Sequence, residues 1–209
     1  HITVNDSDDN LAAGAVTFSG NIGATKSLLE VHVGADDATA GNAVFQGSLA
    51  ATTINLESGE HNDEDSIITV ATTTTATTLN VTATTGAETA DSTFTGTGNI
   101  VAPTINITAG TGGVAHGILV AKADVTASTL FKLIDATGNG SSQITTSGTG
   151  DQTITGAITA SVAGSGNITN SNTGGTVTFA NAIGTDALET GTITTATSTK
   201  TVFDGTINT

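Results

Sequence analysis

Short phrases that recur every 24–26 residues are the feature that most constrains the fold of this chain. Three of them, Ile-Asn-Leu, Leu-Asn-Val and Ile-Asn-Ile, begin at Ile54, Leu79 and Ile105, which are 25 and 26 residues apart. Each places a polar residue between two aliphatic ones, the alternation of a strand with one buried face. A repeat of this length cannot bury its apolar face alone, so successive repeats must stack. The period therefore predicts an all-β fold, a β-solenoid with coils of roughly 24–26 residues.

A second set of phrases consists of Phe, then Gly or Asn two residues later, then Ile or Leu. They begin at Phe18, Phe45, Phe179 and Phe203. The segment 153–158 fits the same pattern with Ile154 in the place of Phe. We expect Phe and Ile to face the interior and Gly to leave room at a tight bend. The predicted core ladder comprises Phe18, Phe45, Phe94, Phe179, Phe203, Ile54, Leu79 and Ile105.

The spacing of the remaining Phe residues supports two further expectations. Phe94 follows Phe45 by 49 residues, close to two periods, so we expect Phe45 and Phe94 to occupy equivalent places two coils apart. The 37 residues from Phe94 to Phe131 fit no multiple of the period, which predicts an insertion or an irregular turn between them.

The composition is typical of slim coils. The 209 residues include six Phe and no Trp, Tyr, Met or Cys, while 26 Gly supply turns and abundant β-branched residues favour strands. A β-sandwich is the main alternative, but it would need larger core residues and more Asn-Gly or Asp-Gly hairpin turns than the single pairs at 139–140 and 204–205. We therefore expect one solenoid over 1–209. Because the chain begins at His1, we expect it to be a piece of a larger protein.

Three segments stand apart from the repeat. Residues 117–135 are the most continuously apolar, which predicts fully buried strands or, alternatively, a short helix capping one face. The segments 57–66 and 109–117 are rich in acidic residues and in glycine, respectively, and are expected to be loops that protrude from the stack.

The charge of the chain argues against two classes of partner. There are 19 acidic residues and four lysines, no arginine, and a net charge of −15. Nucleic-acid binding and attraction to an anionic membrane surface both require basic residues. No apolar run approaches the ~18 residues of a membrane span, so we expect no membrane insertion within this segment.

An acidic cluster is the best candidate for a metal site. It comprises Glu57, Glu60, Asp63, Glu64 and Asp65. Ca²⁺ takes about six to eight oxygen ligands and tolerates flexible loops. The cluster matches neither the EF-hand spacing nor the Gly-Asp nonapeptide repeat. The sequence therefore leaves two interpretations open, a calcium site and an acidic loop exposed to solvent, and no other cofactor is expected.

The histidines and the repeated Asn residues have simpler interpretations. His1, His32, His61 and His116 are far apart and show no metal-site spacing. His32 lies between Val31 and Val33 and is expected to point outward from a strand. Asn80 and Asn106 belong to N-x-T sequences, but they arise from the repeat phrase itself and predict an outward Asn ladder rather than glycan acceptors.

Enzymatic activity is not expected. Some β-helices are polysaccharide lyases or hydrolases, which need carboxylate pairs or a basic residue in a groove, usually beside aromatic platforms. This chain lacks Arg, Trp and Tyr, and it has no Gly-x-Ser-x-Gly nucleophile motif. We therefore predict no catalytic residues.

Residues 16–33 and 43–56 resemble the passenger domains of bacterial autotransporters. The phrases Val-Thr-Phe-Ser-Gly-Asn-Ile-Gly-Ala-Thr and Ala-Thr-Thr-Ile-Asn-Leu are similar to repeats of the rickettsial outer-membrane-protein-B type of surface antigen. The resemblance is clear over 14–107, returns at 175–207 and is weak over 108–150. It implies a right-handed parallel β-helix on the bacterial cell surface, outside the cell, and it brings no catalytic residues.

Two functions from different classes follow. The first is a rigid structural or adhesive rod displayed at the cell surface. The second is a self-assembling subunit of a surface layer or an extracellular filament, with calcium in its acidic loops. A strand edge at the end of a β-helix invites another chain to continue the stack. Expected partners are copies of the chain, other surface proteins, and host or surface glycans. A fibre module of three intertwined chains is a third alternative.

Overall fold

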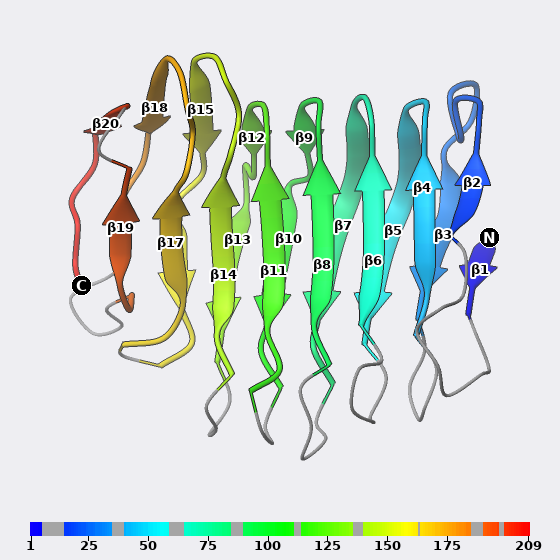
Figure 1. Cartoon of the computed structure of the whole chain (residues 1–209), viewed down its shortest axis with the longest axis horizontal. Coiled ribbons are helices and arrows are strands. Elements are labelled where there is room, and N and C mark those ends of the chain that lie inside the picture. Colours follow the sequence, from blue (N-terminus) through cyan, green and yellow to red (C-terminus); the bar gives the residue numbers. More distant parts are fainter. Residues whose placement is uncertain are drawn as a thin grey trace.

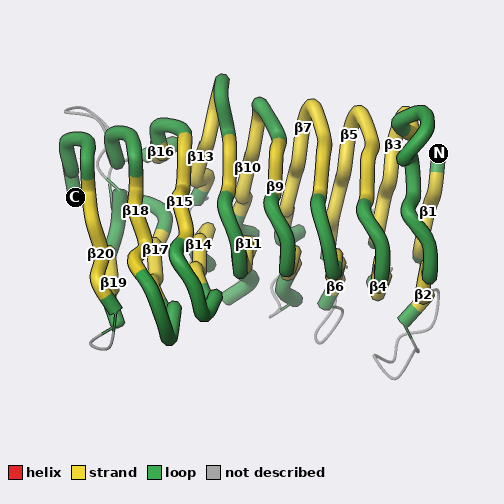
Figure 2. Tube along the Cα trace, turned by 90° about the horizontal axis from the view of Figure 1, so that it is seen from above, coloured by secondary structure: helices red, strands yellow, loops and turns green. Residues whose placement is uncertain are grey.

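The computed structural model is an all-β, parallel β-solenoid whose coils of about 25 residues lie side by side along one axis (Figure 1). The structure describes residues 1–5, 15–34, 40–58, 65–84, 90–110, 114–135, 140–162, 164–184, 190–196 and 199–209. Seen from above, the chain winds from one end of the stack to the other, with the N-terminus and the C-terminus at opposite ends (Figure 2). The solenoid predicted from the period is confirmed.

Among the residues that the structure describes, every strand pair is parallel, and the strands form two sheets of twelve and eight strands. The first sheet has twelve strands: β1 Ile2–Val4, β3 Leu28–Val33, β5 Leu49–Glu57, β7 Thr74–Thr82, β9 Ile100–Val101, β10 Thr104–Thr108, β12 Val125–Thr126, β13 Leu130–Ile134, β15 Gln152–Thr155, β16 Ile158–Ala160, β18 Thr176–Phe179 and β20 Lys200–Phe203. The second sheet has eight: β2 Val16–Phe18, β4 Asn42–Phe45, β6 Ser66–Val70, β8 Ser92–Gly96, β11 Gly117–Ala121, β14 Ser142–Thr146, β17 Asn167–Asn170 and β19 Ile193–Thr195.

The first sheet is bent along a line, so that each coil has three sides. In β5 the alternation of buried and exposed residues breaks at Thr52 and Thr53, and the pairing with β7 skips one residue at the same place. Later coils replace this bend by two short strands, such as β9 and β10, with Pro103 between them. Proline is tolerated there because a residue at the corner does not have to donate a backbone N–H to a neighbouring strand. We call the side before the bend the first arm and the side after it the second arm.

Columns of apolar residues fill the space between the sheets. Ile54 pairs with Leu79 and Leu79 with Ile105, so these three residues stack in successive coils. Phe131 follows Ile105 in the same column, and Ile158 follows Phe131. Because Phe131 lies on the second arm and Phe94 on the second sheet, their odd spacing reflects two different sides of the coil. The insertion predicted between them is therefore wrong.

The expected equivalence of Phe45 and Phe94 is also wrong. Phe45 pairs with Val70, and Val70 pairs with Gly96. Phe94 pairs with Ile68 and lies one inward position earlier on the sheet. Both rings are fully buried, but they belong to neighbouring columns.

The Phe-x-Gly-x-Ile phrase marks a tight corner, and that corner is not the same in all coils. In the first coils it joins the second sheet to the first arm, since Phe45 lies in the second sheet and Leu49 in the first arm. In the last coils it joins the first arm to the second arm, since Phe179 ends β18 and Ile183 pairs with Ile158 of β16. Ile154 pairs with Phe179, as the pattern at 153–158 predicted.

The change of corner follows from a change in coil shape. At the corner between the second sheet and the first arm, Leu49 follows Phe45 by four residues. In a later coil the equivalent inward residues are Thr146 and Ile154, and Ile154 follows Thr146 by eight residues. The wider corner leaves more space, and the larger Phe179 and Phe203 occupy the column that begins with Ile22 and Leu49. Two pairs of Phe rings stack between neighbouring coils. The ring centroids are 4.7 Å apart for Phe18 and Phe45, and Phe179 stacks on Phe203 in the same way.

The apolar segment 117–135 forms β11, β12 and β13 and is not a helix. Leu119, Val125 and Phe131 are fully buried, one on each side of the same coil. Among the residues that the structure describes, no helix has the length and apolar character needed to cross a bilayer.

Replacing Thr74 with valine is expected to stabilise the fold by ~1 kcal/mol. Thr74 is fully buried between Leu49 and Ile100, and its hydroxyl has no hydrogen-bond partner among the described residues. Valine keeps the shape and removes the unsatisfied group. Denaturant unfolding measures the gain. Ser92→Ala is the control of opposite sign, because Ser92 Oγ donates to the Thr82 carbonyl at 2.6 Å. An equal loss of stability in both variants would contradict this prediction.

Candidate functional site

Two of the five residues of the acidic cluster lie in the described part of the chain. Glu57 ends β5, and its Oε2 lies 3.2 Å from Nε2 of His32, which points outward from β3 in the preceding coil. Asp65 precedes β6, and its Oδ1 accepts the backbone N–H of Asp91 at 2.6 Å. The other candidates, Glu60, Asp63 and Glu64, lie outside the described residues, as does His61.

Both described carboxylates are thus used in contacts between neighbouring coils. Within the described ranges, no group of three or more His, Asp and Glu side chains is placed to hold a metal ion. The calcium site stays a prediction for the segment between β5 and β6.

A ladder of amide side chains runs along the outer face of the second arm. Asn106 Nδ2 donates to Asn80 Oδ1 at 2.9 Å, and Asn80 Nδ2 donates to Asn55 Oδ1 at 2.8 Å. Asn55 Nδ2 then donates to Glu30 Oε1 at 2.9 Å, and Nδ1 of His1 lies 3.2 Å from the second oxygen of Glu30. The Asn ladder predicted from the repeat is confirmed, and it extends to Glu30.

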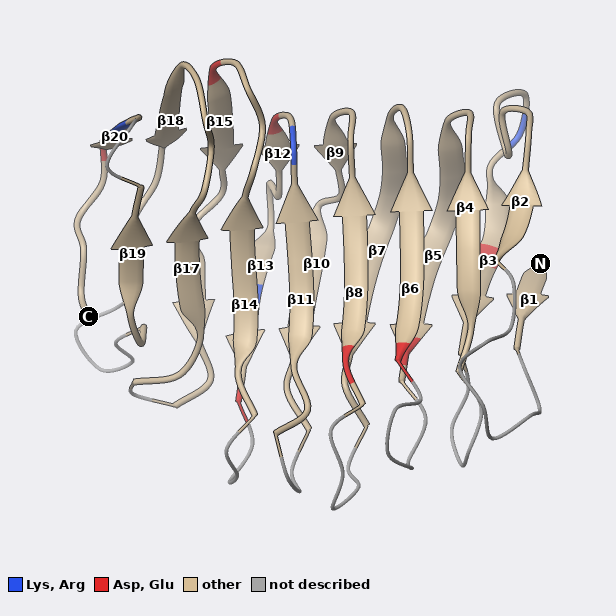
Figure 3. Ribbon diagram, viewed as in Figure 1, with Lys and Arg blue, Asp and Glu red and all other residues tan. Residues whose placement is uncertain are grey.

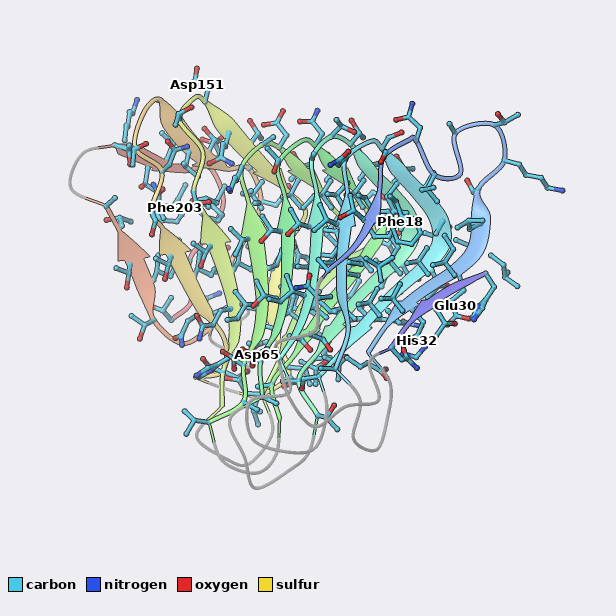
Figure 4. All side chains as sticks on the ribbon, turned by 45° about the vertical axis from the view of Figure 1, so that its right-hand side comes forward. Phe18, Glu30, His32, Asp65, Asp151 and Phe203 are labelled. Atoms are coloured by element: carbon cyan, nitrogen blue, oxygen red, sulfur yellow. The ribbon has the colours of Figure 1, made fainter. Side chains whose placement is uncertain are left out.

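The ladder follows directly from the register of the coils. Asn55 pairs with Asn80 and Asn80 with Asn106, so identical amides meet at the spacing of neighbouring strands. An amide has both a donor and an acceptor, so one residue type can link any number of coils. Figure 4 shows Glu30 and His32 on the same side of the first coils, away from Asp65 at a corner.

A second column runs along the corner that leads into the second sheet. Asp65 Oδ1 accepts the N–H of Asp91, Asp91 Oδ1 accepts the N–H of His116 at 2.7 Å, and His116 Nδ1 accepts the N–H of Ser141 at 3.0 Å. Each side chain therefore holds the backbone of the next coil. We call Asp65, Asp91, His116 and Ser141 the corner column.

The corner column brings together Ser, His and Asp, but in the geometry of a structural element. Ser141 Oγ lies 3.1 Å from His116 Nδ1. In a catalytic triad the carboxylate would accept the other ring N–H of the histidine. Here Asp91 accepts the backbone N–H of His116 instead. Because Nδ1 accepts from the Ser141 N–H, the neutral ring carries its proton on Nε2.

Sequence reasoning missed the corner column, although its members recur with the period of the coil. The intervals are 26, 25 and 25 residues. The residue type changes along the column while the ability to accept a hydrogen bond is retained. A search for acceptor side chains at the coil period would have found it.

Burial raises the pKa of Asp91 above its usual value of 3.8, and the neighbouring Asp65 carboxylate raises it further. The hydrogen bond from the backbone N–H of His116 and the charge of the His116 ring lower it in part. A raised pKa means that the fold favours the protonated form. Asp91 therefore contributes stability below pH 3.8, and this contribution is lost as the pH rises through the raised value.

Asp91→Asn is expected to raise the stability at pH 7 by at most ~1 kcal/mol, because the half-buried carboxylate is partly screened by solvent. The amide oxygen can still accept the His116 N–H, while the buried charge is gone. The gain should shrink near pH 3, where Asp91 itself is protonated. Thermal unfolding at both pH values measures the difference. Asp151→Asn is the matched control, since Asp151 also accepts a backbone N–H, from Thr176 at 2.7 Å, but is exposed. A gain that does not depend on pH would contradict the argument.

The described strands of the second sheet contain no Asp, Glu, Lys or Arg, and their arrows are tan along most of their length in Figure 3. Strands β4, β6, β8, β11, β14 and β17 alternate between buried residues and partly exposed Thr, Val, Ile, Asn and Gln. On the second arm, by contrast, the outward positions of β3, β5 and β13 include Glu30, His32, Glu57 and Lys132. The outer surface of the second sheet therefore differs in chemistry from that of the second arm.

No protein-family model, curated protein or solved structure matches this chain. The fold is therefore defined by the chain's own strand pairing.

Proposed function

We propose that this chain is a non-enzymatic structural and adhesive segment of the bacterial cell surface, a rigid β-helical rod displayed outside the cell. The observation that carries the proposal is the unbroken pairing of the first sheet, which continues from β1 through β20. Because every coil is hydrogen-bonded to its neighbours on all its sides, the stack resists bending and leaves few strand edges open to proteases.

Three further features support a structural role. The Asn ladder and the corner column link successive coils through side chains, in addition to the backbone. The net charge of −15 keeps such a rod soluble and away from anionic membrane surfaces. The resemblance of residues 16–33 and 43–56 to autotransporter passenger domains favours the same role and a right-handed coil.

Antibody labelling of intact and permeabilised cells of the source bacterium tests the location. An antibody raised against the purified chain is expected to label both equally, because the rod is exposed outside the cell. An antibody against a cytoplasmic protein is the control and should label only permeabilised cells. Labelling that appears only after permeabilisation would refute the proposal.

A self-assembling subunit of a surface layer or filament is the second candidate function. The uncharged outer face of the second sheet favours it, because an acidic protein can meet its own copy there without facing like charges. Electron microscopy of the purified chain distinguishes the two, since separate particles favour the rod and lattices or filaments favour assembly. Dissolution of a lattice by a chelator would further indicate calcium in the acidic loops.

A further inference from the structure

We propose that the outer face of the second sheet is a self-association surface on which a second copy of this chain packs face to face. The inference rests on the assembly form of the proposed function. It identifies the partner as the chain itself and the contact as one flat sheet against another.

Two columns of outward side chains make up this face, and strand pairing keeps both in register. The first column is Asn42, Ile67, Thr93, Ile118, Gln143 and Asn167. The second is Thr17, Val44, Thr69, Thr95, Val120, Thr145, Thr169 and Thr194. Most are β-branched, which gives the face a regular relief with few side-chain rotamers to lose on contact.

The absence of charge over these two columns is what points to a copy of the same chain. The whole chain has a net charge of −15, so most approaches of two copies bring acidic groups together. Neither column contains a charged residue. A face without charge, repeated from coil to coil, is complementary to itself, as a two-fold dimer interface must be.

The face is large enough for a specific contact. Eight strands spaced by ~4.8 Å, each with about four or five residues across the face, cover on the order of 500 Å² per copy. Two copies would bury about 1,000 Å² in total, at the lower limit of specific interfaces. We therefore expect a reversible dimer that forms at micromolar concentrations. Packed sheets lie ~10 Å apart, a distance that β-branched side chains from both faces can fill.

Charged residues lie at both borders of the sheet and outside the two columns. Asp65 and Asp91 lie just before β6 and β8, at the edge where the strands begin, while Lys122 and Asp124 follow β11 at the opposite edge. Two copies that meet through the uncharged columns keep these charges at the rim of the contact.

Sedimentation velocity of the purified chain over a concentration series tests the proposal. The wild-type chain is expected to shift from monomer to twice the monomer mass as its concentration rises. Thr95→Lys, in the middle of the face, should weaken the dimer at least about tenfold, because the interface would bury an unpaired charge. Lysine makes the net charge less negative, so a general increase in repulsion cannot explain the loss.

Thr78→Lys is the matched control. Thr78 of β7 and Thr95 of β8 are both partly exposed threonines, but Thr78 points outward from the second arm of the first sheet. The Thr78→Lys chain should dimerise as strongly as the wild-type chain. Circular dichroism confirms that both variants are folded, and Val44→Lys repeats the test on another strand of the face.

Three outcomes would overturn the proposal. They are a wild-type chain that stays monomeric throughout, a Thr95→Lys dimer as strong as wild type, and a dimer lost through Thr78→Lys. A monomeric chain would leave the labelling of intact cells unaffected, so failure of this inference is distinguishable from failure of the proposed location.

Discussion

Replacing Gly34 with alanine is expected to lower the free energy of unfolding by ~3 kcal/mol or more. Gly34 follows β3 at a corner, has a φ of +77°, and donates its N–H to the Val4 carbonyl of the preceding coil. A Cβ atom there would overlap the carbonyl oxygen of Glu57 in the next coil and would lie 2.6 Å from Ser66 Oγ. The backbone of two coils would have to separate, since a carbonyl group cannot move aside as a flexible side chain can.

Gly164→Ala separates this steric effect from the cost of the backbone conformation. Gly164 also has a φ of +77°, but no described atom lies within 4 Å of the position of its Cβ. Alanine in the left-handed region alone costs about 1 kcal/mol. Thermal unfolding should therefore place the midpoint of Gly34→Ala roughly 6 °C or more below wild type, and that of Gly164→Ala only a few degrees below. Equal losses would show that coil-to-coil contact at Gly34 is unimportant.

The period of the sequence predicts the fold because, in a parallel stack, each strand residue pairs with the residue one coil length later in the chain. Ile54, Leu79 and Ile105 recur every 25 or 26 residues and pair directly with one another. The Asn ladder is predictable for the same reason, since each Asn stands between two inward residues of the repeated phrase.

The Phe residues show where this reasoning fails. A phrase such as Phe-x-Gly-x-Ile specifies a tight corner through local geometry, but a coil has several corners. Phe45 and Phe179 begin the same phrase on different sheets. Only the pairing between coils, a long-range property, determines which corner a phrase forms. The distance between two Phe residues therefore measures the period only when both lie on the same side.

The candidate site was predictable only in part, because the sequence shows charge more readily than hydrogen bonding. The acidic residues were evident, but the structural use of Asp65 and Asp91 depends on backbone N–H groups of the following coil. The uncharged face of the second sheet was not evident either, since its residues are separated by about one coil length in the sequence and become contiguous only through register.

Replacing Gln152 with leucine is expected to lower the free energy of unfolding by ~3 kcal/mol, although leucine is apolar and similar in size. Gln152 is 2% exposed. Its Nε2 donates to the carbonyls of Ala121 at 3.1 Å and Ala123 at 3.2 Å, while its Oε1 accepts from Asn172 Nδ2 at 2.7 Å and from the Gly148 N–H at 3.3 Å. Leucine would remove all four hydrogen bonds. The Ala121 carbonyl would keep the Ser147 N–H and Asn172 Nδ2 would keep the Gly150 carbonyl, but the buried Gly148 N–H would lose its side-chain acceptor.

This network fills the wide corner between Thr146 and Ile154. The equivalent corners of the first coils span only four residues. Two residues of the next coil continue the network. Asn172 Nδ2 donates to Gln152 Oε1, and Asn170 Oδ1 accepts from Thr146 Oγ1 at 3.1 Å. The corner is therefore held open by hydrogen bonds where the earlier coils use apolar packing. Removing one member should loosen the coils from β14 to β18 while the first coils stay intact.

Gln46→Leu is the control for the same chemical change at an exposed position of a tight corner, and its stability should stay within about 0.5 kcal/mol of wild type. Denaturant unfolding gives the loss of free energy, and amide hydrogen exchange shows where it acts. In Gln152→Leu, exchange should accelerate in β14, β15 and β18, and protection in β4 to β8 should be retained. Faster exchange along the whole stack would mean that the solenoid unfolds as one cooperative unit, and unchanged stability would mean that the buried amide makes no net contribution to the wide corner.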